Sequence, residues 1–271
     1  MSLSSALVWG TSDFFGGLAT RKQHVIQVLT LSSFSGICAL ILCLVGHVNT
    51  FPSFTGFLWA AISGVAGAIG LAFFYYGLSL GNTVVVAPTA AVVGAMLPVG
   101  FTFFLDGFPK LLQLVGFALA FLGIWFVSQT SFNSIENVHS GFWIAVLAGI
   151  FFAVFFIFIS RVESSQVIMP VLVSRSFELL VALVILRARK IPLPSLSSNK
   201  IAVLAGILDS GGSILFVYAK YLTRLDVAVV LSSLYPVMTV CLSYFFLKEK
   251  ITISQWVGVV LCFSSVILIS I

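Results

Sequence analysis

The sequence predicts an all-α integral membrane protein with ten transmembrane helices in two inverted five-helix repeats. Three observations predict this fold class: the composition, the length of the apolar runs and an internal repeat. Hydrophobic residues make up 60% of the 271-residue chain, charged residues make up 8%, and the mean hydropathy is +1.19. The surface of a soluble protein with this composition would be largely hydrocarbon. Lipid must therefore surround most of the chain.

Ten apolar runs are long enough to cross the ~30 Å hydrocarbon core, which takes about 20 residues in a helix. They cover residues 2–20, 25–46, 56–79, 82–105, 110–128, 140–160, 166–186, 200–222, 226–247 and 252–271. Each run is apolar on every face, which excludes a barrel of short alternating strands. Most of the breaks between the runs are short, so consecutive helices should be antiparallel neighbours.

The sequence of residues 60–128 repeats at 202–270, with a constant shift of 142 positions and no gap. The register aligns Gly64 with Gly206, Gly70 with Gly212, Tyr76 with Tyr218, Met96 with Met238, Gln113 with Gln255 and Gly116 with Gly258. A common register across three helices indicates a duplicated five-helix unit. We therefore predict repeats at 1–128 and 140–271, joined by a polar linker at 129–139.

Five spans in each repeat is an odd number, so the second copy enters the membrane from the opposite side. The two repeats are then related by a two-fold axis in the membrane plane. This arrangement is typical of secondary transporters, which alternate access around a site near the midplane.

Near the C-terminus, Pro236 is followed by a polar break at 248–250 (Lys-Glu-Lys) and then by Gln255 and Gly258. Together with the opening segment 9–14 (WGTSDF), these residues resemble the EamA domain, the repeat unit of the ten-helix drug/metabolite transporter superfamily. The resemblance covers essentially the whole chain. It implies a transporter of small organic molecules, with the substrate bound between helices one, three, four, six, eight and nine, and it does not name the cargo.

The first repeat departs from this pattern, because Gly94 stands where the second repeat has Pro236, and Gly107 stands opposite Glu249. Pro98 could replace the missing proline. Proline frees a backbone carbonyl and bends a helix, so Pro88, Pro98 and Pro236 are candidate helix-bending residues.

Four charged residues inside the predicted spans are candidates for substrate binding or coupling, because burial of a charge at a helix centre costs roughly 2.5–3.5 kcal/mol on insertion scales. Asp13 lies in a glycine-rich stretch and could bind a proton or a cationic group, or cap a local break. Asp209 aligns with Gly67, so an acid is present in only one copy. It could couple transport to protons, or accept a hydrogen bond from a neighbouring Ser or Trp.

Arg175 and Glu178 are three residues apart and can neutralise each other on one helix face. The alternative role for Arg175 is to clamp a substrate carboxylate or phosphate. Among the aromatic residues, Trp9 is deep enough in its span to face a substrate. Tyr76 and Tyr218 occupy equivalent positions and could line the cavity or belong to the interfacial belt.

These features predict a secondary transporter, an exporter or exchanger in the cell membrane, that moves a small organic metabolite such as an amino acid or a drug-like compound by alternating access. Coupling to protons would use Asp13 or Asp209. The alternatives are a flippase for a lipid-linked or amphiphilic substrate and, in another class, a membrane-embedded enzyme. The sequence contains no nucleotide-binding loop, nucleophile elbow or zinc-protease motif. We therefore expect neither an enzyme nor an ATP-driven pump, and no cofactor or metal.

The net charge of +5 does not indicate a nucleic-acid partner. Lys and Arg lie mainly in short loops, where they contact headgroups and set the orientation. Ten spans place both termini on one side, which the family resemblance puts in the cytoplasm. The basic loops gather on the opposite side and predict the reverse orientation. The sequence indicates no oligomeric state.

Overall fold

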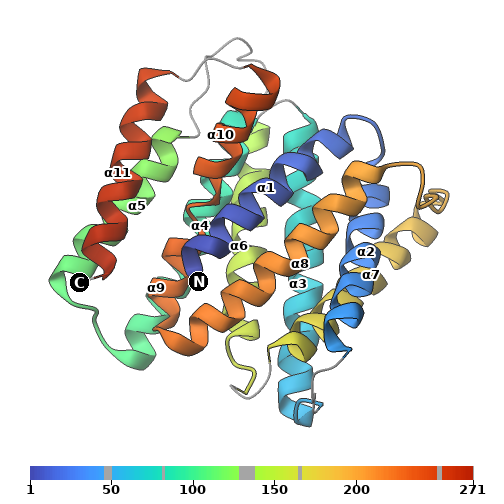
Figure 1. Ribbon diagram of the computed structural model, residues 1–271, viewed down its shortest axis with the longest axis horizontal. Helices are drawn as coiled ribbons and strands as arrows, with labels where there is room; N and C mark the ends of the chain where they lie inside the picture. Colours follow the sequence, from blue (N-terminus) through green and yellow to red (C-terminus); the bar gives the residue numbers. More distant parts are fainter. Residues whose placement is uncertain (46–50, 81–82, 128–137, 164–166, 249–251, 271) are drawn as a thin grey trace.

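The structure is a computed structural model and describes residues 1–45, 51–80, 83–127, 138–163, 167–248 and 252–270. All regular structure in these ranges is helical (Figure 1). The first half contains α1 (Ser2–Thr20), α2 (Val25–Leu44), α3 (Phe54–Ser79), α4 (Thr83–Asp106) and α5 (Leu111–Val127). The second half contains α6 (Val138–Ile159), α7 (Ile168–Ala188), α8 (Lys200–Leu222), α9 (Leu225–Ser232), α10 (Tyr235–Leu247) and α11 (Ile253–Ser270). The predicted all-helical fold class is confirmed.

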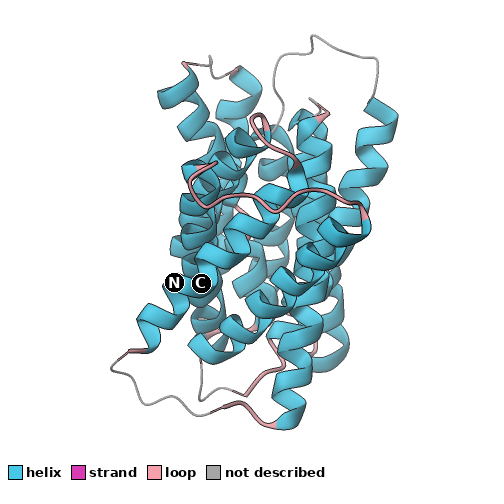
Figure 2. Cartoon of the chain, turned by 90° about the vertical axis from the view of Figure 1, so that its right-hand side faces the viewer, coloured by secondary structure: helices cyan, strands magenta, loops and turns pink. Residues whose placement is uncertain are grey.

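The axes of most of these helices are roughly aligned with one another (Figure 2). Within the described ranges, seven segments are long and apolar enough to cross a membrane: α2, α3, α7, α8, the larger parts of α4 and α6, and α9 together with α10. The helices α5 and α11 are apolar but shorter. Every predicted helix except the ninth begins and ends within two residues of its predicted bounds. The predicted linker at 129–139 falls mostly outside the described residues, as does most of the polar break at 248–250.

The ninth span, predicted over 226–247, is present as Leu225–Phe246, but the structure divides it into two helices, α9 and α10, instead of one. The chain turns at Ser233 and Leu234, and the Val237 amide donates to the Leu234 carbonyl at 3.0 Å. The physical reason is Pro236, the second residue of α10. Proline lacks an amide hydrogen, and its ring collides with the carbonyl four residues earlier. That carbonyl belongs to Ser232, where α9 ends.

The other two prolines lie within α4, which continues from Thr83 to Asp106 without interruption. Pro98 is buried, and its carbonyl accepts a hydrogen bond from the Thr102 hydroxyl at 2.8 Å. Bending at Pro88 and Pro98 stays a prediction.

The most extensive helix–helix contacts in the described structure all join the two halves, and they come in symmetric pairs. Helix α1 packs on α8 as α6 packs on α3, and α2 packs on α8 as α7 packs on α3. Two further pairs, α2 with α7 and α5 with α11, join helices that are each other's equivalents (Figure 1). This pattern is that of two repeats related by a two-fold axis.

Two glycines illustrate this symmetry at the level of single residues. Gly64 of α3 lies against the carbonyl of Ser174 in α7, so closely that an added Cβ would collide with it. The 142-residue shift converts this pair into Gly206 of α8 and the carbonyl of Ser32 in α2, and the same collision would occur there. Small residues let membrane helices approach at the backbone. Both glycines are therefore needed for the contact between the halves.

The repeated glutamines have the same structural role in both halves. The Gln255 side chain accepts a hydrogen bond from the Thr252 amide at 2.8 Å, and the Thr252 hydroxyl accepts one from the Gln255 amide at 3.3 Å. This is a capping box at the start of α11. At the start of α5, Gln113 likewise accepts a hydrogen bond from the Lys110 amide at 3.2 Å. The glutamines begin helices, so the repeat they mark belongs to the scaffold.

Candidate functional site

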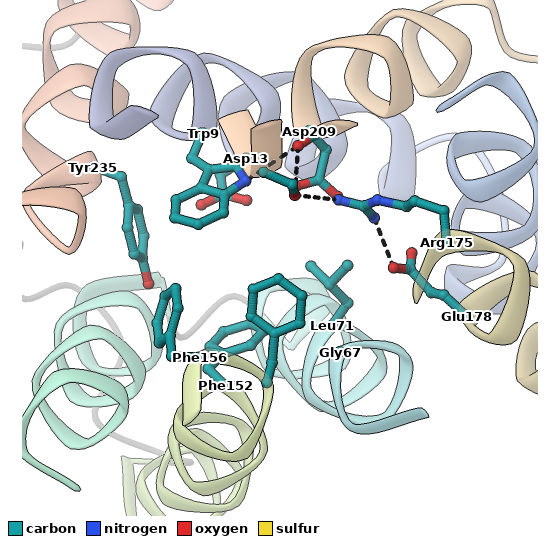
Figure 3. Close-up of a pocket in the computed structure, with 12 residues that line it drawn as sticks. Trp9, Asp13, Gly67, Leu71, Phe152, Phe156, Arg175, Glu178, Asp209 and Tyr235 are labelled. Carbon is teal, nitrogen blue, oxygen red and sulfur yellow. Dashed lines mark hydrogen bonds and ion pairs between the residues drawn. The ribbon is translucent and has the colours of Figure 1, made fainter. Parts of the chain in front are cut away.

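A pocket lies between the two halves and is lined by residues from six helices (Figure 3). The lining residues are Trp9 and Asp13 from α1, Gly67 and Leu71 from α3, Phe152, Phe155 and Phe156 from α6, Arg175 and Glu178 from α7, Asp209 and Ser213 from α8, and Tyr235 from α10. The pocket therefore depends on both repeats and on the break that separates α10 from α9.

Helix α1 brings Trp9 and Asp13 to the pocket because hydrogen bonds hold it against α8. The hydroxyl of Ser5 donates to the Gly212 carbonyl at 2.8 Å, and that of Ser12 donates to the Ala205 carbonyl at 2.8 Å. The Trp9 indole, only 8% exposed, donates to the Asp209 backbone carbonyl at 3.2 Å. These bonds fix the face of α1 that points into the pocket.

One wall of the pocket is a buried charge network centred on Arg175. Its guanidinium contacts the Glu178 carboxylate at 2.7 Å and the Asp209 carboxylate at 2.6 Å, and donates to the Ser213 hydroxyl at 3.1 Å. Glu178 also accepts a hydrogen bond from the Ser33 hydroxyl at 2.7 Å. Arg175 and Glu178 are almost completely buried. The predicted Arg175–Glu178 pair is therefore present, and Asp209 is its third member.

The facing wall is aromatic. The rings of Trp9 and Phe156 have centroids 5.7 Å apart, and Phe216 packs behind both of them, at 5.6 Å from Trp9 and 4.8 Å from Phe156. Phe152 also lines this wall, while Leu71 lies between it and the charged side (Figure 3). Charged and aromatic surfaces thus face each other across the pocket.

Two polar groups in the pocket have no hydrogen-bond partner among the described residues. The first is the carboxylate of Asp13, which interacts with Asp209 only through the repulsion of like charges. The second is the hydroxyl of Tyr235, a residue that is only 7% exposed. Buried polar groups nearly always have partners, so the buried Tyr235 hydroxyl, next to the partly buried carboxylate of Asp13, indicates a place for a bound molecule.

The structure places Trp9, Asp13, Arg175, Glu178 and Asp209 together in this pocket. It does not bring Tyr76 and Tyr218 there, because neither lines the pocket and both are about half exposed, at 50% and 46%.

Sequence reasoning missed the aromatic side chains of α6 and also Tyr235. The phenylalanines of α6 gave no signal, because lipid-facing phenylalanines surround them in the sequence. The signal for Tyr235 was its position directly before Pro236, where the helix breaks.

Comparison with known families decides the class of this protein. The sequence profile of the EamA-like transporter family matches the chain twice, over residues 1–129 and 139–271. The chain belongs to the EamA-like transporter family. It is therefore a multi-pass membrane transporter and not an enzyme, and two EamA domains form the two halves around the pocket.

Two further comparisons found similarity, one over a single repeat and one over the whole fold. An uncharacterized protein of Methanocaldococcus jannaschii is 31% identical to this EamA transporter over 132 residues, which are 47% of this chain and 96% of the relative. The matched length is that of one repeat. A solved crystal structure superposes with a TM-score of 0.73 over 98% of this chain and 94% of that chain. Its sequence identity is 17%, so this likeness shows the fold alone.

Proposed function

We propose that this EamA transporter is a secondary transporter, an exporter or exchanger, that carries a small organic metabolite through the pocket between its two domains. Alternating access would expose the pocket to each side of the membrane in turn. The observation that supports the proposal is the pair of unpartnered polar groups, Asp13 and Tyr235, in a pocket that both halves build. An amino acid and a drug-like compound are both candidates at this level.

The balance of charged groups in the pocket supports a role for protons. Three carboxylates and one guanidinium line the described pocket. Arg175 pairs with Glu178 and Asp209, so its positive charge is already shared between two acids. The Asp13 carboxylate has no cation beside it. An uncompensated charge at this depth is costly, and a bound proton or a cationic substrate would remove that cost.

The groups that face Asp13 make it the better coupling candidate of the two aspartates. Asp209 faces it from α8, Tyr235 from α10 and Tyr75 from α3. Beyond Asp209 lie Arg175 and Glu178 of α7, which are already engaged in the charge network. A proton on Asp209 would weaken its ion pair with Arg175, whereas a proton on Asp13 breaks no ion pair.

The pocket has a cavity volume of about 60 Å³. This space holds a few water molecules or a small chemical group. A drug-sized molecule would require the walls to move apart. The volume therefore supports a substrate whose polar end is small.

Transport assays in proteoliposomes test the proposal. The purified protein is reconstituted with an imposed pH gradient, and the uptake of labelled amino acids, amines and drug-like compounds is followed with and without a protonophore. We expect at least one compound to accumulate with the gradient and to equilibrate when the protonophore is added. If the accumulation of a compound is the same with and without the pH gradient and the protonophore, this result would contradict proton coupling.

A further inference from the structure

We infer that the substrate of this pocket is a small organic cation, a protonated or quaternary amine, whose charged nitrogen binds between Asp13 and the aromatic rings of Trp9, Phe156 and Tyr235. The inference rests on the proposed function and specifies its substrate class. It follows from three properties of the pocket: the free carboxylate, the aromatic wall and the engagement of the arginine.

The first property is the position of the unpartnered groups. Asp13 and Tyr235 reach the pocket from α1 and α10, which the hydrogen bond from the Thr239 hydroxyl to the Gly10 carbonyl, at 3.1 Å, holds together. The Tyr235 hydroxyl is nine-tenths buried and lacks a partner among the described residues. A carboxylate and a hydroxyl oxygen both accept hydrogen bonds, so the two groups suit the N–H donors of a protonated amine. A quaternary amine has no N–H group and would be attracted to the Asp13 carboxylate by its charge alone.

The second property is the aromatic wall. A cation is attracted to the face of an aromatic ring within about 6 Å of its centroid, and the attraction is strongest for Trp. Trp9 and Phe156 lie 5.7 Å apart, and Figure 3 shows both rings on the same side of the pocket as Tyr235. Arg175 and Glu178 lie on the opposite side of that view. A nitrogen bound among the three rings would therefore lie on the other side of the pocket from the guanidinium of Arg175.

The third property, the engagement of Arg175, argues against an anionic substrate. An anionic substrate would need a free cation in the pocket, and Arg175 is the cation that lines it within the described residues. One terminal nitrogen of Arg175 contacts Glu178 at 2.7 Å, and the other contacts Asp209 at 2.6 Å and Ser213 at 3.1 Å. A substrate carboxylate would have to displace these protein carboxylates. A zwitterionic amino acid is disfavoured for the same reason, because its carboxylate would meet the same competition.

Four compounds of nearly the same shape test the charge preference directly. They are choline, which is cationic; betaine, which is zwitterionic; 3,3-dimethyl-1-butanol, which is neutral; and 3,3-dimethylbutyrate, which is anionic. Binding to the purified protein in a non-ionic detergent is measured by isothermal titration calorimetry. We expect choline to bind at least about tenfold more tightly than its neutral isostere, a ratio within reach of desolvated cation–π contacts. Betaine should bind more weakly than choline, and the anion should bind least.

Two variants with matched controls locate the binding. Asp13→Asn and Trp9→Leu should each reduce the preference for choline over the neutral isostere by about tenfold. Glu163→Gln removes an exposed acid in the turn after α6, and Trp143→Leu removes an exposed aromatic ring of α6. Both controls should keep the preference. The comparison of the four ligands uses the unmodified protein, so it tests the charge preference even if a variant fails to fold.

Equal binding of choline and 3,3-dimethyl-1-butanol would overturn the inference, as would tighter binding of either carboxylate compound. A preference for choline that survives in Asp13→Asn would also overturn it, as would failure of all four compounds to bind. The proposed function fails separately: if choline binds selectively but no compound in the transport panel responds to the pH gradient, the substrate class stands and proton coupling falls. If an anion is instead transported by the pH gradient, proton coupling stands and the cationic substrate class falls.

Discussion

Gly67 and Asp209 occupy equivalent positions in the two repeats, and both line the central pocket. The same 142-residue shift relates Leu71 to Ser213, and both of these residues also line the pocket. The duplicated scaffold therefore places the pocket where the two copies meet. The two copies then differ at these positions, so that α3 contributes space and an apolar surface while α8 contributes a carboxylate and a hydroxyl.

Filling the space at Gly67 should block the pocket without harming the fold. An added Cβ would lie 3.4 Å from the Phe155 ring and 3.8 Å from the Glu178 carboxylate, so Gly67→Ala fits. We expect Gly67→Ala to weaken transport and Gly67→Leu to abolish it, with little change in the thermal unfolding midpoint in detergent. Gly100→Ala in α4, where nothing lies within 4 Å, is the control. Wild-type transport by Gly67→Leu would place the substrate elsewhere.

Removing the cation from the charge network should strongly destabilise the protein. Arg175→Leu leaves Glu178 and Asp209 buried without their shared partner. Breaking a buried ion pair in this way costs about 3–5 kcal/mol, and we expect a large fall in the unfolding midpoint. Arg187→Leu changes an exposed arginine at the end of the same helix and should have little effect. An unchanged midpoint in Arg175→Leu would show that the network does not stabilise the fold.

The close approach of the two halves at Gly206 gives a further stability test. In Gly206→Ala, the new Cβ would collide with the Ser32 carbonyl, and backbone must move to accommodate it. Overpacking of this kind costs about 1–3 kcal/mol or more. Gly211→Ala on the same helix places its Cβ 3.8 Å from Val8, an ordinary contact, and should be neutral. If the two variants unfold at the same temperature, the predicted backbone contact is absent.

An ion pair at one end of the molecule should control access to the pocket. Arg224 contacts Asp226 at 3.0 Å and donates to the backbone carbonyls of Asp106 and Gly107 at 3.2 and 2.9 Å, which joins the second half to the end of α4. The hydrogen bond to Asp226 raises the pKa of Arg224, so the guanidinium stays charged. We expect Arg224→Gln to loosen this contact between the halves.

Alkylation measures this loosening. A protein whose native cysteines are replaced carries Ser213→Cys as a reporter in the pocket. Arg224→Gln should increase the rate of alkylation by a water-soluble reagent applied on the side of the termini by several-fold. Lys190→Gln, on the opposite side, is the control. A rate that does not change with Arg224→Gln would contradict a closing role for this pair.

The sequence allowed the helices to be predicted closely, because a membrane span has a required length and polar breaks mark its ends. It allowed the Arg175–Glu178 pair to be predicted, because residues three apart share a helix face. Their third partner, Asp209, depends on how α7 packs near α8, which no local pattern contains. The tyrosines illustrate the same limit. Tyr76 and Tyr218 share a repeat position but lie outside the pocket, whereas Tyr235 enters it through the break before Pro236.

Substrate-driven proton movement in proteoliposomes tests the central claim, that Asp13 is the coupling group of the pocket, most directly. Vesicles containing a pH-sensitive dye receive a transported compound, and the change in internal pH is compared for wild type, Asp13→Asn and Glu163→Gln. We expect proton movement in wild type and in Glu163→Gln and none in Asp13→Asn, although Asp13→Asn still folds. Proton movement in Asp13→Asn at the wild-type rate would contradict this claim.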